Sequence, residues 1–396
     1  MNIPVMKYLD ENIGKAACFA LNLFSKNKIT SIAYKADVKN ILLVKFWGMG
    51  SIILTTPALK NIRKEYPNAK IYYLTLAGNK EICSLIDDID EVVGINLDNP
   101  FSFTIDTLRK IYRLRKKKFD LVFDFEFFTY YSAIIVKLIN KKYSVGFNNL
   151  KNNRNKLFSE TIIFENNLHT RENFLNLVSS YCNIVSGDFS RIEYKNEIHT
   201  KFNLGGEPVI VVNPNASLLA YERRLPAKDY IRIIDHLTTN NKFKIALIGL
   251  EEESVYVNGI FESLINKEKV INLCGKLNIE NLAGLLSSSL CLITNDSGPL
   301  HMASALNVPS ISFFGPESPG KYGPLSRDKL VFYNNLDCSP CMSVSNSKTV
   351  NCIYNKPLCM TAFDMDSVIN RIDSFVSALL AEKEIVIEEN NSNKIG

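Results

Sequence analysis

The chain has 396 residues, of which 46% are hydrophobic and 22% charged, and a formal net charge of +5. This composition excludes an intrinsically disordered chain and a membrane bundle, and the length predicts two domains. No run of about 18 uninterrupted apolar residues occurs, so we expect no membrane-spanning helix.

The start of the chain lacks the basic segment, apolar stretch and cleavage site of a secretory signal. The nine cysteines are odd in number and scattered, unlike the disulfide framework of a small secreted domain. Both features predict a cytoplasmic protein whose cysteines are mostly reduced.

Residues 1–40 form an N-terminal extension, in which 5–24 have the pattern of an amphipathic helix. One face of that helix carries Tyr8, Ile13, Ala17, Leu21 and Phe24. Packing of this face on the rest of the protein and anchoring at a membrane surface are the two alternatives.

Residues 41–204 are predicted to form a first doubly wound α/β domain. The apolar, β-branched run at 41–46 ends in a glycine turn and is followed by a helical pattern at 56–66. Further strands are expected at 70–76, 91–95, 119–123 and 143–146, and helices at 80–86 and 132–139. Such alternation is typical of parallel βαβ units.

Seven basic side chains lie within ten residues, directly before the strand at 119–123. They are Arg109, Lys110, Arg113, Arg115, Lys116, Lys117 and Lys118. A solvated helix face and a surface for lipid or phosphate are equally compatible with this stretch.

Residues 205–362 are predicted to form a second doubly wound domain, which begins at the Gly205-Gly206 pair. Its strands are expected at 208–212, 243–248, 270–273, 290–294 and 310–314, and its helices at 227–237, 253–265, 279–287 and 299–306. A last helix at 363–385 and a disordered tail at 386–396 complete the chain.

The most informative local pattern is the segment 294–301, in which a strand runs into a tight turn and a helix. The first turn of a helix presents free N–H groups, and parallel sheets place ligands at the carboxyl ends of their strands. This arrangement predicts a diphosphate site that needs no metal, flanked by Asp296 and His301. A capping turn beside a buried histidine is the structural alternative.

Two further segments are expected at the same edge of the second domain. Gly315 follows a strand, in a turn that keeps backbone amides free. The pair Arg223-Arg224 precedes a helix, where guanidinium groups can stabilise phosphate charge. Arginine pairs are also common on protein surfaces.

In the first domain, the turn from Gly48 to Ser51 has neither the third glycine of a dinucleotide site nor the lysine of a P-loop. Gly48 and Gly50 allow either a close backbone approach to a sugar or a plain tight turn. Asp124 and Glu126 follow the strand at 119–123, where a carboxylate can act as a general base or cap the next helix.

A cysteine-containing loop lies near the end of the second domain. Its cysteines are Cys338, Cys341, Cys352 and Cys359. They allow a structural metal or redox pair, but their irregular spacing favours reduced cysteines packed under the last helix. We therefore expect no metal and no cofactor.

Three segments across residues 40–375 resemble glycosyltransferase family 9, the ADP-heptose:lipopolysaccharide heptosyltransferase family. They are ILLVKFWGMGSIILTTPALKNIRKEYPNAKI, NPNASLLAYERRLP and NLCGKLNIENLAGLLSSSLCLITNDSGPLHMASALNVPSISFFGP. The resemblance implies the GT-B fold, in which two Rossmann-like domains face each other across a cleft and the final helix crosses back to the first domain.

The resemblance also implies roles for individual residues. Donor contacts fall on Asp296, Ser297, Gly298, His301, Arg223 and, by a looser match, Glu251. Leu225 stands where relatives carry tryptophan. Ser51 stands where most members carry the aspartate proposed as base, and Glu126 where they usually carry glutamine. We therefore hypothesise that Glu126, next to Asp124, has taken over the role of the base.

These inferences predict an inverting, metal-independent transfer of a heptose or related sugar. The donor is a nucleotide diphosphate sugar, expected to be ADP-heptose, and the acceptor is the lipopolysaccharide core or another envelope glycolipid. Peripheral contact with the inner membrane is compatible with this function, whereas nucleic acid is not an expected partner. A catalytically impaired nucleotide-sugar binding protein is the alternative that Ser51 suggests, and the incomplete glycine fingerprint argues against an NAD enzyme.

Overall fold

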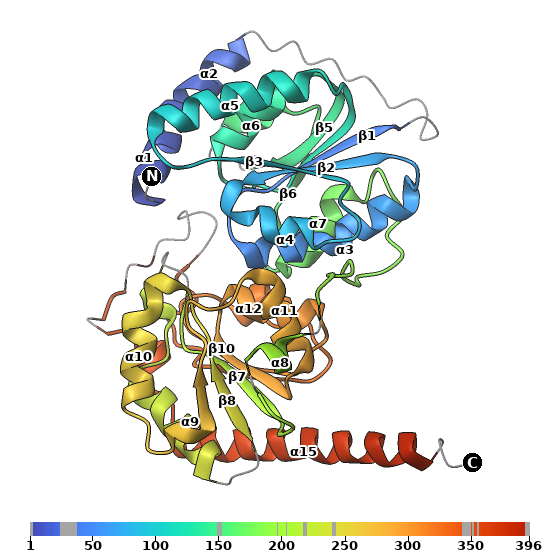
Figure 1. Ribbon diagram of the computed structural model, residues 1–396. Coiled ribbons are helices and arrows are strands. Elements are labelled where there is room, and N and C mark those ends of the chain that lie inside the picture. The colour runs from blue at the N-terminus through green and yellow to red at the C-terminus, as the bar shows by residue number, and fades with distance from the viewer. Residues whose placement is uncertain are drawn as a thin grey trace. The chain divides into compact units, whose positions relative to one another are not determined.

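The computed structural model describes residues 3–23, 38–148, 153–195, 197–202, 204–216, 220–239, 243–342, 350, 352–354 and 356–392. The chain divides into two compact units, of which the first ends at Glu193 and the second begins at Tyr194. Each unit is built on its own six-stranded parallel sheet with helices on both faces (Figure 1). The predicted α/β fold with two doubly wound domains is therefore confirmed.

Unit 1 has the strand order β3-β2-β1-β4-β5-β6. The strands are β1 Asn40–Val44, β2 Lys70–Leu76, β3 Glu91–Ile95, β4 Phe119–Asp124, β5 Lys141–Asn148 and β6 Glu160–Ile163. The helices are α1 Ile3–Leu9, α2 Lys15–Leu23, α3 Met49–Glu65, α4 Lys80–Ser84, α5 Pro100–Arg115, α6 Tyr130–Leu138 and α7 Thr170–Val178. β1 and β4 are central and almost completely buried; β1 is apolar after Asn40, and β4 is apolar apart from Asp120 and Asp124.

Unit 2 has the strand order β12-β11-β10-β7-β8-β9. The strands are β7 Val209–Asn213, β8 Lys244–Leu247, β9 Val270–Asn272, β10 Cys291–Asn295, β11 Ser310–Phe314 and β12 Lys329–Tyr333. The helices are α8 Ile198–Lys201, α9 Ala227–Thr239, α10 Ser254–Glu262, α11 Ile279–Ser288, α12 Gly298–Ala305, α13 Pro319–Tyr322, α14 Leu358–Thr361 and α15 Met365–Ser392.

The last helix, α15, continues to Ser392, beyond the end predicted for it at 385. It packs on α9 and β12 of unit 2, where Val368, Ile372 and Val376 are buried in the core. The crossing to the first domain that the family resemblance implies stays a prediction. Among the described residues, no helix is both long and apolar enough to cross a bilayer.

The N-terminal extension packs on unit 1, and only part of the predicted face is buried. Ala17 and Leu21 are partly buried, and Leu21 packs on the core of unit 1. Tyr8 and Ile13 are 68% and 64% exposed, whereas Gly14 and Cys18 are buried against α6 and the 3₁₀ turn Asn153–Leu157. The cause is a π-helical turn, Asp10–Gly14, between α1 and α2. Its wider turn rotates α2 relative to α1, so one 3.6-residue period cannot describe both helices. Phe24, also assigned to that face, lies outside the described residues.

Asp10, in the π-helical turn, caps α6 from a distance in sequence. Its carboxylate accepts the N–H groups of Tyr130 (3.0 Å) and Tyr131 (2.8 Å). The adjacent Thr129 makes no capping bond, because its hydroxyl pairs with that of Ser132. Burial raises the pKa of Asp10 to about 6, against the two N–H bonds and the more distant Arg154 that lower it.

Replacing Asp10 with asparagine is expected to change how the stability of unit 1 depends on pH. Because the pKa of Asp10 is higher in the folded protein, the folded state binds more protons, and the associated stability is lost as pH rises through about 6. Between about pH 4 and pH 7, the advantage of wild type over Asp10→Asn should shrink by as much as about 3 kcal/mol. Denaturant titrations followed by the fluorescence of Trp47, the only tryptophan, measure the free energy of unfolding at each pH. A constant difference in this free energy between wild type and Asp10→Asn across the pH range would contradict the prediction.

Candidate active site

In unit 2, the carboxyl end of β10 leads into the first turn of α12. Ser297 precedes α12 but makes no capping bond, because its hydroxyl pairs with that of Thr294 (2.8 Å) and accepts a hydrogen bond from Asn213 Nδ2 (3.1 Å). The side chain that normally satisfies the first N–H groups of a helix is thus engaged elsewhere. With the helix dipole, this leaves an N-terminus suited to an anion, starting at Gly298.

Beside this helix start, Arg223 forms a buried ion pair with Asp296. The distance from Arg223 Nη1 to Asp296 Oδ2 is 2.7 Å, and the two side chains are 11% and 6% exposed. The structure therefore brings together two residues that are 73 positions apart and were both predicted for the site. The pairing neutralises the carboxylate next to the predicted phosphate position and fixes the guanidinium there.

The second arginine of the pair, Arg224, has a different environment. Its guanidinium lies 4.4 Å from the ring centre of Tyr221 and 4.5 Å from that of Tyr256, and it donates to Asn215 Oδ1 at 3.1 Å. Glu253 is a further, longer partner at 3.7 Å. These contacts give Arg224 a packing role, so Arg223 is the arginine that accompanies Asp296.

Asn295, the last residue of β10, holds these segments together, and sequence reasoning missed it. Its Nδ2 donates to the carbonyl oxygens of Pro214 (3.0 Å) and Asn215 (3.1 Å), and its Oδ1 accepts the N–H of Leu225 (3.0 Å). One completely buried amide thus joins the loop after β7 to the segment that carries Arg223. A polar residue at the end of an apolar strand was the available signal.

Leu225 lies in the core of unit 2, where it is completely buried. This explains how a leucine can stand at the position that relatives give to tryptophan: it anchors the arginine segment from beneath. Glu251 is exposed after β8 and lies close to Gly275, where an added Cβ would be 2.0 Å from Glu251 Oε2. Gly275 also has a φ of +73°, a conformation that favours glycine.

The remaining predicted donor residues are buried near the same strands. His301 lies in α12, 4% exposed, with its ring centre 6.3 Å from that of Tyr322. Gly315 follows β11, and an added Cβ there would meet Met360 Sδ at 2.6 Å and Cys359 Sγ at 2.9 Å. The absence of a side chain at Gly315 is therefore needed for α14 to pack.

The cysteine-containing loop packs on the turn after β11. The backbone N–H groups of Cys341 and Met342 donate to the carbonyl of Pro316, at 3.0 and 2.9 Å. Burial raises the pKa of Cys359 to about 11 and also raises that of Cys341, so both thiols are disfavoured as thiolates. All nine cysteines are free, and no metal-binding group of three or more side chains occurs within the described part of the chain.

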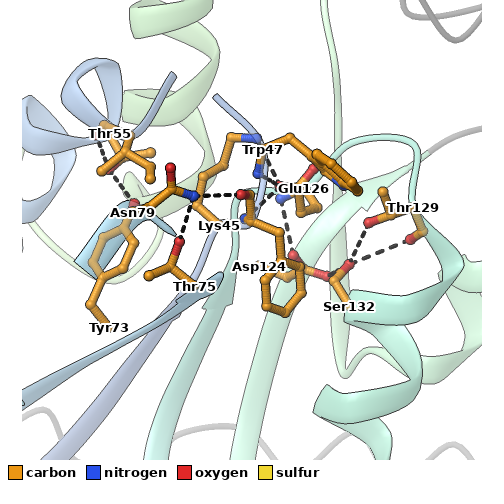
Figure 2. Close-up of polar contacts among 12 residues, drawn as sticks. Lys45, Trp47, Thr55, Tyr73, Thr75, Asn79, Asp124, Glu126, Thr129 and Ser132 are labelled. Atoms are coloured by element: carbon orange, nitrogen blue, oxygen red, sulfur yellow. Dashed lines mark hydrogen bonds and ion pairs between the residues drawn. The ribbon is translucent and has the colours of Figure 1, made fainter. Parts of the chain in front are cut away.

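In unit 1, Glu126 binds the loop between β1 and α3 (Figure 2). Its Oε1 accepts hydrogen bonds from Lys45 Nζ (2.8 Å) and from the backbone N–H groups of Phe46 (2.7 Å) and Trp47 (3.1 Å). Glu126 is completely buried, and its Oε2 has no hydrogen-bond partner among the described residues. One carboxylate oxygen thus positions the loop.

A second side chain holds the same loop from the end of β2. Asn79 Nδ2 donates to the carbonyl oxygen of Phe46 (2.7 Å) and to Thr75 Oγ1 (3.2 Å). The peptide groups of Phe46 are therefore fixed on both sides, by Glu126 and by Asn79 (Figure 2). Neither sequence spacing nor the resemblance pointed to Asn79.

This loop continues into the first turn of α3. Gly48 precedes the helix with a φ of +78°, a conformation that favours glycine and produces the sharp turn. Ser51 lies in the first turn, partly exposed, and Gly50 beside it is buried. The structure thus puts Gly48, Gly50 and Ser51 at the carboxyl edge of the sheet, on the loop that Glu126 and Asn79 hold.

Asp124 belongs to an adjoining buried network. Its Oδ2 accepts from Ser132 Oγ (2.7 Å) and Arg154 Nη2 (2.8 Å), and its Oδ1 accepts the N–H of Glu126 (3.0 Å). Arg154 also donates to the carbonyl of Glu126 at 2.6 Å. Burial raises the pKa of Asp124 to about 6, with Arg154 as the largest opposing influence. Asp124 thus connects Glu126 to Ser132 of α6 and to Arg154.

A family model described as glycosyltransferase family 9 (heptosyltransferase) matches residues 107–350. The lipooligosaccharide heptosyltransferase 2 of Haemophilus influenzae is 22% identical over 72% of this chain and 86% of its own length. That of Campylobacter jejuni serotype O:2 is 25% identical over 74% and 86%.

Solved structures resemble the fold at low sequence identity. A family 9 glycosyltransferase from Veillonella parvula has a TM-score of 0.71 at 20% identity, covering 87% of this chain and 99% of its own. The Escherichia coli ADP-heptose lps heptosyltransferase II has a TM-score of 0.70 at 18% identity, with the same coverage. E. coli heptosyltransferase WaaC, solved with ADP, has a TM-score of 0.64 at 18% identity over 85% and 99%.

The role of Asn295 can be tested by replacing it with alanine. The change leaves two buried carbonyl groups and one N–H group without their partner, so we expect a loss of about 3 kcal/mol in the free energy of unfolding of unit 2. Denaturant titration followed by circular dichroism measures this loss. Asn258→Ala, which removes one hydrogen bond between exposed side chains, is the matched control and should cost less than about 0.5 kcal/mol. Equal losses would contradict the assigned role.

Proposed function

The chain belongs to glycosyltransferase family 9 and is a glycosyltransferase, and on this premise we propose that it transfers a heptose from ADP-heptose to a lipopolysaccharide core or a related envelope glycolipid. The curated relatives are named as heptosyltransferases of lipooligosaccharide and lipopolysaccharide. The observation that supports the donor half of the proposal is the uncapped start of α12 beside Arg223.

The diphosphate of the donor is proposed to lie at the first turn of α12. There the backbone amides after Ser297 and the helix dipole offer positive charge, and Arg223 adds a fixed guanidinium. Asp296 keeps Arg223 in place. As the bond to the anomeric carbon breaks, negative charge grows on the leaving diphosphate, and these groups stabilise it without reorganising. Metal-independent transfer follows from this assignment.

Three further residues complete the proposed donor site. The exposed carboxylate of Glu251 is suited to accept hydrogen bonds from the hydroxyls of the nucleoside ribose. His301, in α12, is assigned to the diphosphate side, and the turn at Gly315 to the sugar side.

Activation of the acceptor is proposed to occur at the loop that Glu126 holds. Ser51 cannot act as a base unaided, and a carboxylate is therefore needed from elsewhere. Glu126 supplies one, since its Oε1 is saturated with donors while its Oε2 has no hydrogen-bond partner among the described residues. Deprotonation of the acceptor hydroxyl and attack on the opposite face of the anomeric carbon gives an inverting reaction. Because Glu126 is buried, binding of the acceptor must open a path to this oxygen.

A lipid-anchored acceptor and a nucleotide-activated donor meet at the cytoplasmic face of the inner membrane. We propose that the enzyme works there as a peripheral protein.

Glu126→Gln separates the base from a purely positioning role. Glutamine can still accept hydrogen bonds from Phe46 and Trp47, but it cannot take a proton, so kcat should fall about 10³-fold with an unchanged KM for the donor. ADP release in the presence of a heptose-deficient lipopolysaccharide core measures both constants. Asn79→Ala loosens the same loop without touching a carboxylate and should cost less than about tenfold.

Two outcomes would contradict the assignment of Glu126. One is near-normal turnover of Glu126→Gln, and the other is an equal loss in Asn79→Ala. Because Glu126→Gln leaves Lys45 buried without its counter-charge, Lys45→Met combined with Glu126→Gln serves as a second variant. Trp47 fluorescence checks that unit 1 is folded in each.

Loss of the gene should remove one sugar from the envelope glycolipid. The mass of the glycolipid from the deletion strain should be lower by one heptose and any sugars beyond it. Complementation with the intact gene should restore that mass, and complementation with Glu126→Gln should not. An unchanged glycolipid profile would contradict the proposed acceptor, and loss of a hexose would contradict the proposed donor sugar.

A further inference from the structure

The N-terminal helices of unit 1 present an apolar face to solvent. Tyr8, Ile13, Phe19 and Leu23 are 68%, 64%, 57% and 70% exposed. The opposite face, with Cys18 and the capping carboxylate of Asp10, is fixed on α6. The segment is therefore held by its inner side, and its apolar residues point outward although burial would have stabilised them.

Helix α5 presents a second exposed face that combines aromatic and basic residues. Phe101, Leu108 and Tyr112 are 76%, 61% and 63% exposed and recur at helical spacing along it. Arg109 and Arg113 are exposed beside them, and neither has an ion-pair partner in the described part of the chain. Two members of the basic stretch noted in the sequence, Arg109 and Arg113, thus lie at the edge of an apolar stripe.

Both faces belong to the same layer of unit 1. α2 and α5 each contact α6, and together they cover the side of the sheet opposite α3, α4 and α7 (Figure 1). Of the eleven exposed large apolar side chains in the described part of unit 1, eight lie on α1, the π-helical turn, α2 and α5, and none on α3, α4 or α7. Such one-sided exposure marks an interaction surface.

Charge decides which partner fits. A second copy of the chain would bring the basic residues of α5 close to their own kind, which costs energy at an interface. An anionic bilayer attracts each lysine or arginine near its surface, accepts aliphatic side chains at the acyl boundary, and favours tyrosine at the headgroup level. Lys116 Nζ lies 4.3 Å from the ring centre of Tyr112, so a basic and an aromatic side chain are paired on this surface.

We propose that this layer docks unit 1 on an anionic lipid bilayer. The docking surface consists of Tyr8, Ile13, Phe19, Leu23, Phe101, Leu108, Arg109, Tyr112, Arg113 and Lys116. The helices lie in the plane of the interface, with their apolar residues inserted and the arginines among the headgroups. The inference deepens the proposed function and rests on it for its purpose, because a glycolipid acceptor is held in such a bilayer.

Docking is tested by sedimentation of the full chain with vesicles that contain no glycolipid. Vesicles of phosphatidylcholine with about one third phosphatidylglycerol should bind the protein, and phosphatidylcholine alone should bind it at least about tenfold more weakly. Binding to the anionic vesicles should fall again at about 0.5 M salt, because screening shortens the reach of the charges. No binding, or equal binding to both vesicles, would overturn the proposal.

Variants assign the binding to this surface. Arg109→Glu with Arg113→Glu, and separately Phe19→Ser with Leu23→Ser, should each weaken vesicle binding at least about tenfold. Lys64→Glu with Lys329→Glu makes the same change in net charge at exposed sites on α3 and β12, and should bind like wild type. Val255→Ser with Ile265→Ser removes apolar residues that are 87% and 79% exposed in unit 2, and is the control for the apolar change.

Two measurements keep docking separate from the transfer reaction. With donor and a delipidated acceptor in solution, the docking variants should keep wild-type turnover, so loss of docking alone leaves that activity intact. Absence of transfer by every variant, including wild type, would refute the proposed function and leave the vesicle result standing. Sedimentation velocity without lipid should give a monomer; a dimer that the Phe19→Ser, Leu23→Ser variant dissociates would overturn docking on lipid in favour of a second copy.

Discussion

The hydrogen bonds that the carboxylate of Glu126 accepts determine the path of the chain at the carboxyl edge of the sheet in unit 1. A loop that leaves a buried strand carries backbone N–H groups that no neighbouring strand satisfies. In this protein two of them, at Phe46 and Trp47, are satisfied by one oxygen of Glu126, which also neutralises Lys45. The path of the chain into α3, and with it the position of Ser51, is set by this contact.

In unit 2, the neutral amide of a side chain satisfies the backbone groups of the loops at the end of the central strand. The amide of Asn295, at the end of β10, bonds two carbonyl groups and one N–H group. These bonds hold the segment that carries Arg223 next to Asp296. A carboxylate could not replace it, because it has no N–H to donate. Glu126 meets only N–H groups of its loop, for which a carboxylate is suited. Asn295 meets one N–H group and two carbonyl groups, for which an amide is suited.

The sequence was sufficient to predict the fold because both sheets are parallel and buried on both faces. Their central strands are continuous apolar runs, and the helices between them have their own period. The resemblance then located Arg223 and Asp296, which the structure brings into contact. Asn79 and Asn295 were not predicted. In the sequence, a polar residue that joins two loops at a strand end cannot be distinguished from one that faces solvent. The buried face of the N-terminal helices was predicted only in part: Leu21 packs on the core, but Tyr8 and Ile13 are exposed, since the π-helical turn at Asp10–Gly14 shifts the helical period.

The two buried ion pairs of unit 1 cost desolvation free energy. Lys45 with Glu126, and Arg154 with Asp124, are completely buried, and replacing such pairs by apolar residues often stabilises a protein. Stability therefore does not explain them. What the pairs provide is a fixed geometry: Arg154 binds both Asp124 and the backbone carbonyl of Glu126, and Lys45 binds the side chain of Glu126. Asp10 caps the helix that carries Ser132, a partner of Asp124, which links the N-terminal helices to the same network. The N-terminal helices and the carboxylate that holds the loop between β1 and α3 are thus linked through α6.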